Sequence, residues 1–121
     1  MADSQILTVI RMWAAVAWAD GVLAESEADG LRRLVRGAEL TDEERATATG
    51  FLERAIKLDD VYLTELTPDA RRGIYRAAVR MALVDHVIQP VERDVLRRMQ
   101  SLLAIPVEIA EEIESDVPGF A

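Results

Sequence analysis

The strongest constraint on the fold of this 121-residue chain is a stretch that occurs twice. Residues 11–33 align without a gap on residues 76–98, and nine of the 23 aligned positions are identical, where chance would give roughly one or two. The identical pairs are Arg11/Arg76, Ala17/Ala82, Asp20/Asp85, Val22/Val87, Glu27/Glu92, Asp29/Asp94, Leu31/Leu96, Arg32/Arg97 and Arg33/Arg98. We interpret this offset of 65 residues as an internal duplication.

Each copy has the pattern of a helix, an acidic turn and a second helix. Residues 4–19 carry apolar side chains at helical spacing on nearly all sides, and Arg11 is their only charge. This composition predicts a central, buried helix. Trp13 and Trp18 lie roughly 140° apart on such a helix, so we expect one to anchor the core and the other to fill a second interface.

The remaining helices are predicted from their start and stop signals. Gly21 favours a left-handed helix end, and a second helix follows from about residue 25 to Gly37. A capping box at residues 41–44 begins a third helix, with an inward stripe of Ala48, Phe51, Leu52, Ala55 and Ile56. Residues 59–66 are predicted as a short helix or turn, and Thr67-Pro68 begins the second long helix.

The C-terminal part repeats the plan and adds one helix. The second acidic turn leads into a helix through Leu96, Met99 and Leu103, a last helix begins at Pro106, and the tail from residue 116 is expected to be loose. The sequence therefore predicts an all-α, compact bundle of six or seven helices in a single domain, residues 1–121. Its two duplicated helix-turn-helix halves span about 4–58 and 67–116.

Composition excludes several classes of function. The formal net charge of −8 disfavours nucleic acid and anionic lipid as partners, because both are polyanions. The absence of cysteine excludes disulfides, Cys-ligated zinc and thiol catalysis. The longest uncharged apolar run, residues 12–19, is far short of the ~20 residues that span a bilayer. With no visible signal peptide, we expect a cytoplasmic protein without membrane insertion.

The acidic turns are the candidate site. Asp20 and Asp85 end one helix, where the helix dipole disfavours negative charge, and Glu27 and Glu92 follow seven residues later. If the halves pack about a pseudo-two-fold axis, these four carboxylates cluster. Such a set of oxygen ligands suits Ca²⁺ or Mg²⁺ better than Zn²⁺. The alternative is structural, since capping and pairing with arginine also satisfy carboxylates. The spacing does not match an EF-hand.

Other polar residues have less specific interpretations. His86 is the only histidine; beside Asp85 it suits a transition metal, and as an exposed loop residue it needs no function. The paired arginines at 32–33 and 97–98 could hold an anion, but we expect them to form ion pairs with Asp29 and Asp94 on solvated faces. No metalloprotease, phosphate-loop or nucleophile-elbow motif occurs, so we expect a protein that is not an enzyme.

The pattern A-x-A-D-G-V-L-x-x-x-E at residues 17–27, repeated one half later, resembles the TerB-like family. That family includes tellurite-resistance proteins and a domain fused to some membrane-bound co-chaperones. The resemblance covers about residues 5–115 and implies a seven-helix fold, a non-enzymatic role in stress response linked to tellurite or metal resistance, and metal binding at Asp20, Glu27, Asp85 and Glu92. His86 stands where the family pattern has glycine.

Two functions follow as expectations. The first is a TerB-like stress-response protein that binds a divalent cation through its acidic turns. The second is an interaction module whose helical surface binds another, unidentified protein, with acidic turns that only stabilise the fold.

Overall fold

The computed structural model describes residues 5–19, 21–56, 60–83 and 88–120, with only the backbone for residues 60–62. Seven helices and no strands occur within these ranges, which confirms the all-α prediction. They are α1 (Gln5–Ala17), α2 (Glu25–Gly37), α3 (Asp42–Gly50), α4 (Asp60–Glu65), α5 (Pro68–Ala82), α6 (Pro90–Leu102) and α7 (Val107–Ser115). In this described part, none of the helices combines the length and apolar character needed to cross a membrane.

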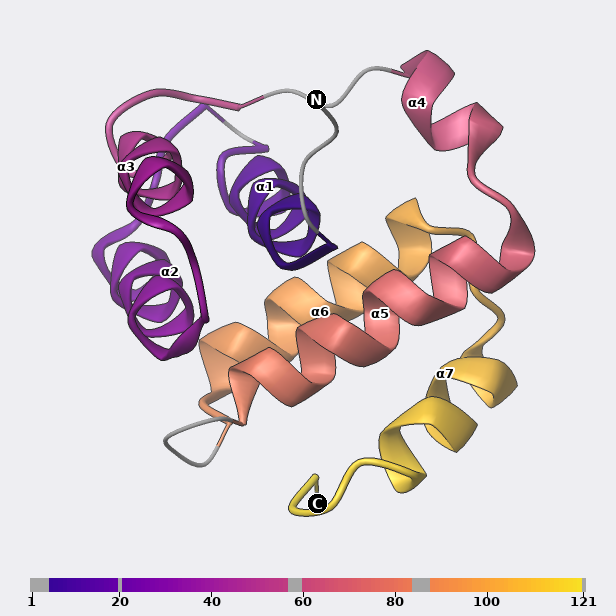
Figure 1. Ribbon diagram of the computed structural model, residues 1–121. Coiled ribbons are helices and arrows are strands. Elements are labelled where there is room, and N and C mark those ends of the chain that lie inside the picture. Colours follow the sequence, from indigo (N-terminus) through magenta and orange to yellow (C-terminus); the bar gives the residue numbers. More distant parts are fainter. Residues whose placement is uncertain (1–4, 20, 57–59, 84–87, 121) are drawn as a thin grey trace.

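The bundle is built around α1, which packs against α2, α3, α5 and α6. Figure 1 shows α5 and α6 running side by side across the view, whereas α1, α2 and α3 are seen nearly end-on. The last helix, α7, packs against α5. Because α1 has neighbours on most sides, eight of its residues are buried, as its apolar composition predicted.

The two tryptophans of the first helical segment have the separate roles that their spacing predicted. Trp13 is 1% exposed and is the largest fully buried side chain of the core. Trp18 is half-buried, and its indole Nε1 donates a hydrogen bond of 2.7 Å to the carbonyl oxygen of Phe51. Trp13 therefore fills the centre, and Trp18 attaches the end of α1 to the segment that follows α3.

The helix ends also follow the sequence signals. Gly21 has a φ of 86°, the left-handed conformation that glycine adopts without steric cost. Thr41 Oγ1 accepts from the backbone N–H of Glu44, and Thr67 Oγ1 accepts from that of Ala70, each at 3.1 Å. These N-caps satisfy N–H groups that the first helical turn leaves without partners.

Two arginines donate hydrogen bonds to carbonyl groups at the C-terminal ends of helices. Arg45 of α3 donates to the carbonyls of Val35 and Ala38 at 2.9 and 3.0 Å, where α2 ends. Arg71 of α5 donates to the carbonyl of Leu103 at 2.8 Å, just beyond α6, and to carbonyls at the end of α4. Each guanidinium thus joins its own helix to the end of a neighbouring one.

The third helix is shorter than its predicted stripe. It ends at Gly50, the next residues form tighter turns, and Ala55 is exposed rather than inward. Glycine has low helix propensity. In addition, the hydroxyls of Thr47 and Thr49 bond back to carbonyls four residues earlier, a bonding pattern that bends and weakens helices.

The prediction that the tail from residue 116 is loose was also wrong. Val117 is 4% exposed within the core, and the Arg93 guanidinium lies 4.9 Å from the centroid of the Phe120 ring. Gly119, with a φ of 91°, turns the chain so that Phe120 reaches α6. Next to this tail, α7 is bound to α5 by a hydrogen bond from the Tyr75 hydroxyl to Glu114, and burial, more than this bond, raises the pKa of the Tyr75 phenol.

Candidate functional site

Glu27 and Glu92 occupy the same position in their helices, the third residue of α2 and of α6. Each carboxylate reaches back to the start of its helix: Glu27 Oε1 accepts from the Ala24 N–H at 3.3 Å, and Glu92 Oε1 accepts from the Gln89 N–H at 2.8 Å. This is the glutamate half of a capping box, because neither Ala24 nor Gln89 returns a side-chain bond. Both glutamates therefore stabilise the first turn of their own helix.

The same two carboxylates also pair with arginines of the opposite helix. Arg98 Nη2 of α6 lies 3.0 Å from Glu27 Oε2 of α2, and Arg33 Nη2 of α2 lies 3.9 Å from Glu92 Oε1 of α6. The offset of 65 residues relates Glu27 to Glu92 and Arg33 to Arg98, so each contact is the counterpart of the other. We call these contacts the reciprocal pairs.

The two reciprocal pairs differ in burial. Glu92 is 1% exposed and is the only buried charged residue among those described, whereas the Glu27 side chain is 13% exposed. Gly30 of α2 packs beside Glu92, since a Cβ at that position would lie in ordinary van der Waals contact with the Glu92 Cγ, at 3.5 Å. Transferring a carboxylate out of water is costly unless it is paired and hydrogen-bonded, which explains why Glu92 accepts a backbone N–H beside a guanidinium.

Arg98 connects the first pair to the end of α1. Its Nη1 donates to the Val16 carbonyl at 3.1 Å, and its Nη2 also lies 2.8 Å from Asp94 Oδ2. The buried Nε atoms of Arg33 and Arg98 have no hydrogen-bond partner among the described residues, a second feature that the two arginines share. Arg98 thus fixes three helices, α1, α2 and α6, around Glu27.

The other two predicted ligands, Asp20 and Asp85, lie outside the described residues, as does His86. The expected meeting of four carboxylates therefore stays a prediction. Within the described ranges, no group of three or more acidic or histidine side chains is arranged to hold a metal ion.

An apolar hollow of about 580 Å³ adjoins the first acidic turn. Arg98 is one of its lining residues. Most of the wall is formed by apolar side chains, chiefly those of Trp18, Ala55, Ile56, Leu63 and Leu102. Because its hydrogen bond to Phe51 orients the Trp18 indole, this wall is held in place. We call this feature the apolar hollow; its chemistry suits an apolar group, and its described lining residues include no nucleophile and no acid–base pair.

The arginines were only partly predicted from the sequence. Arg32 does pair with Asp29, at 2.6 Å, and Arg98 does pair with Asp94. The crossing of Arg33 and Arg98 to the opposite glutamates was missed. The available signal was their register, since both arginines recur six residues after the repeated glutamate.

Comparison with known proteins gives no assignment: no protein-family model, curated protein or solved structure matches this chain significantly.

Proposed function

We propose that this chain is a cytoplasmic, TerB-like, non-enzymatic module that acts in stress response by binding another protein, and that its acidic turns are structural. The repeated acidic pattern and the seven-helix, all-α architecture support the TerB-like assignment. The absence of cysteine is compatible with a reducing compartment.

The observation that carries the structural role of the turns is the set of reciprocal pairs. Glu27 and Glu92 each accept a helix-starting N–H and each face a guanidinium. A cation at either glutamate would have to displace an arginine or share the carboxylate with it, and like charges close together repel. The two glutamates are therefore better suited to joining α2 and α6 than to holding a metal.

The apolar hollow is the surface that we assign to the partner. It is open to solvent, mostly apolar, and bordered by a guanidinium whose contacts to Val16, Glu27 and Asp94 hold it in place. Protein interfaces gain most of their affinity where an apolar or aromatic side chain enters such a pocket. A partner helix that inserts an apolar side chain beside Trp18 fits this chemistry.

The first test separates structural turns from a cation site. We expect the melting temperature to be unchanged by millimolar Ca²⁺, Mg²⁺ or Zn²⁺, because a ligand raises it only by binding the folded state. The matched variant is Asp20→Asn with Asp85→Asn. A metal-dependent rise in the wild type that this double variant abolishes would establish the cation-binding function and contradict ours.

The second test concerns the partner. Ala55 is exposed and lines the apolar hollow, so Ala55→Arg places a charge there without altering the core. We expect this variant to lose proteins that the wild type retains from a lysate of its own cells, by cross-linking and affinity capture. Ala46→Arg, an exposed change on α3 outside the hollow, is the control. Retention of the same proteins by wild type and Ala55→Arg would contradict the assignment of the hollow.

A further inference from the structure

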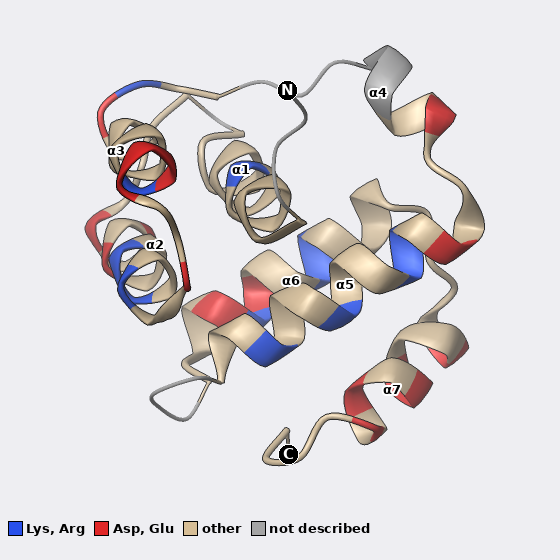
Figure 2. Cartoon of the chain, in the orientation of Figure 1, with Lys and Arg blue, Asp and Glu red and all other residues tan. Residues whose placement is uncertain are grey.

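A second hollow lies where the N-terminal end of α1 meets α5. It measures about 350 Å³ and is lined by α1 at its N-terminal end and by α5. Arg76 and Arg80 border it, and Ile6, Ala77 and Met81 provide its apolar part. We call this feature the arginine hollow. Figure 2 shows basic positions recurring along α5, in contrast to the acidic positions of α7.

Neither arginine of this hollow has an acidic partner among the residues that the structure describes. Within the described ranges neither guanidinium forms an ion pair, whereas Arg72, one turn earlier on α5, pairs with Asp69 at 2.5 Å. Acidic side chains are abundant in a chain of net charge −8, and α7 beside α5 carries several. Two neighbouring arginines that pair with no described carboxylate form a local patch of positive charge on a chain of net negative charge.

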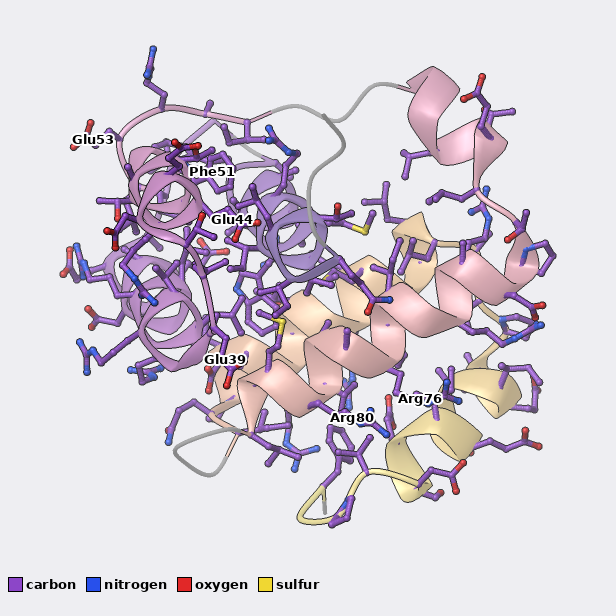
Figure 3. All side chains as sticks on the ribbon, in the orientation of Figure 1. Glu39, Glu44, Phe51, Glu53, Arg76 and Arg80 are labelled. Atoms are coloured by element: carbon purple, nitrogen blue, oxygen red, sulfur yellow. The ribbon has the colours of Figure 1, made fainter. Side chains whose placement is uncertain are left out.

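The spacing of the arginines defines what they can hold. Residues four apart on a helix are neighbours, about 5–6 Å between Cβ atoms. Figure 3 shows Arg76 and Arg80 on successive turns of α5, leaving the helix on the same side. Two guanidiniums at this spacing match two carboxylates one helical turn apart, and each can bind its carboxylate through two parallel hydrogen bonds.

The floor of the hollow adds a second requirement. Gly73 leaves room there, since a Cβ would meet only the Gln5 amide nitrogen, at 3.6 Å. Ile6, Ala77 and Met81 are half-buried and pack on the core from this side. An occupant with both carboxylates and an apolar side chain satisfies the whole hollow. An extended polyanion such as nucleic acid fits less well, because it covers more of the surface and is repelled by the net negative charge of the rest of the protein.

We infer that the arginine hollow binds an acidic segment of a partner protein, with two carboxylates about one helical turn apart and an apolar side chain between them. The inference rests on the proposed role as an interaction module, and adds the chemical class of a segment that it binds. The occupant contacts α5 and α1 and does not touch the apolar hollow beside Trp18.

The test measures the fluorescence anisotropy of a labelled synthetic peptide that carries two glutamates one helical turn apart and a leucine between them. We expect Arg76→Ala with Arg80→Ala to weaken binding about tenfold or more, as the loss of two solvent-accessible, charge-assisted contacts implies. Raising the salt concentration should also weaken binding by the wild type. Because neither arginine forms an ion pair with another described residue, the variant should fold, which circular dichroism verifies.

Two further variants separate local recognition from net charge. Arg36→Ala with Arg54→Ala removes the same charge from exposed positions outside the hollow, and should change affinity less than about twofold. Gly73→Leu keeps both arginines but fills the floor, and should weaken binding severalfold. Equal losses in the Arg36/Arg54 and Arg76/Arg80 variants would reduce the effect to long-range attraction and overturn the inference.

The probe and its competitors decide the remaining outcomes. Equal binding of a peptide with glutamine in place of both glutamates would refute charge recognition. Tight binding of inorganic phosphate with the same arginine dependence would make this a small-anion site and overturn the peptide assignment. Ala55→Arg should bind the acidic peptide normally; capture that depends on Ala55 without any peptide binding would refute the arginine hollow and leave the proposed function standing.

Discussion

Glu92→Ala is expected to lower the free energy of unfolding by about 3 kcal/mol. The change leaves the Gln89 N–H without its acceptor, leaves the Arg33 guanidinium without its carboxylate, and opens a space under α2. Breaking a fully buried pair costs roughly 3–5 kcal/mol. The Arg33 side chain is 32% exposed, so water recovers part of this loss and the lower end applies. Urea unfolding followed by circular dichroism measures the effect.

Two variants serve as controls for Glu92→Ala. Glu92→Gln keeps the shape and the oxygen that accepts from Gln89, so it should cost about half as much. Glu27→Ala removes the related but more exposed carboxylate, and should cost about 1–2 kcal/mol. A Glu92→Ala protein that is more stable than Glu27→Ala would show that the buried carboxylate does not support the contact between α2 and α6.

Trp13→Ala is expected to have the largest effect on stability, about 4 kcal/mol. Trp13 is 1% exposed, and large-to-small changes of buried aromatic residues cost roughly 3–5 kcal/mol through lost burial and the cavity that remains. Since domains of this kind have a total stability of about 5–15 kcal/mol, the variant should be close to unfolding. The midpoint of chemical unfolding, followed by the fluorescence of Trp18, measures the loss.

Trp18 provides the matched control. Trp18→Phe keeps an aromatic ring and loses the hydrogen bond from Nε1 to the Phe51 carbonyl, so it should cost about 1 kcal/mol. Fluorescence of the remaining Trp13 reports this transition. If Trp18→Phe destabilised the protein more than Trp13→Ala, the assignment of Trp13 as the central core residue would be wrong.

The helices were predictable because their signals are local. Gly21 permits a left-handed turn, and Thr41 and Thr67 cap whichever helix follows them, irrespective of the rest of the fold. The buried face of α1 was predictable for a similar reason, since a helix that is apolar on nearly all sides has to be surrounded. These features require only the residues within one or two turns.

The failures concern contacts between distant segments. The tail is buried because Phe120 meets Arg93 on α6, and composition near a chain end does not reveal such a contact. Likewise, Arg98 lies four residues after Asp94, which predicts the local ion pair and hides the contact with Glu27. The contact between Arg98 and Glu27 can be predicted only when the packing of α2 against α6 is known.

The reciprocal pairs have a consequence for how this chain can vary. Arg33 of α2 contacts Glu92 of α6, while Glu27 of α2 contacts Arg98 of α6. This is the isologous form of contact, in which two subunits of a symmetric dimer use one self-complementary surface twice. In a dimer of identical subunits every substitution occurs in both copies, so both contacts change together. In a single chain the two contacts are made by different residues, and each can change alone. Here the Arg33–Glu92 contact has a fully buried carboxylate and the Glu27–Arg98 contact a more accessible one, a difference that two identical subunits could not adopt.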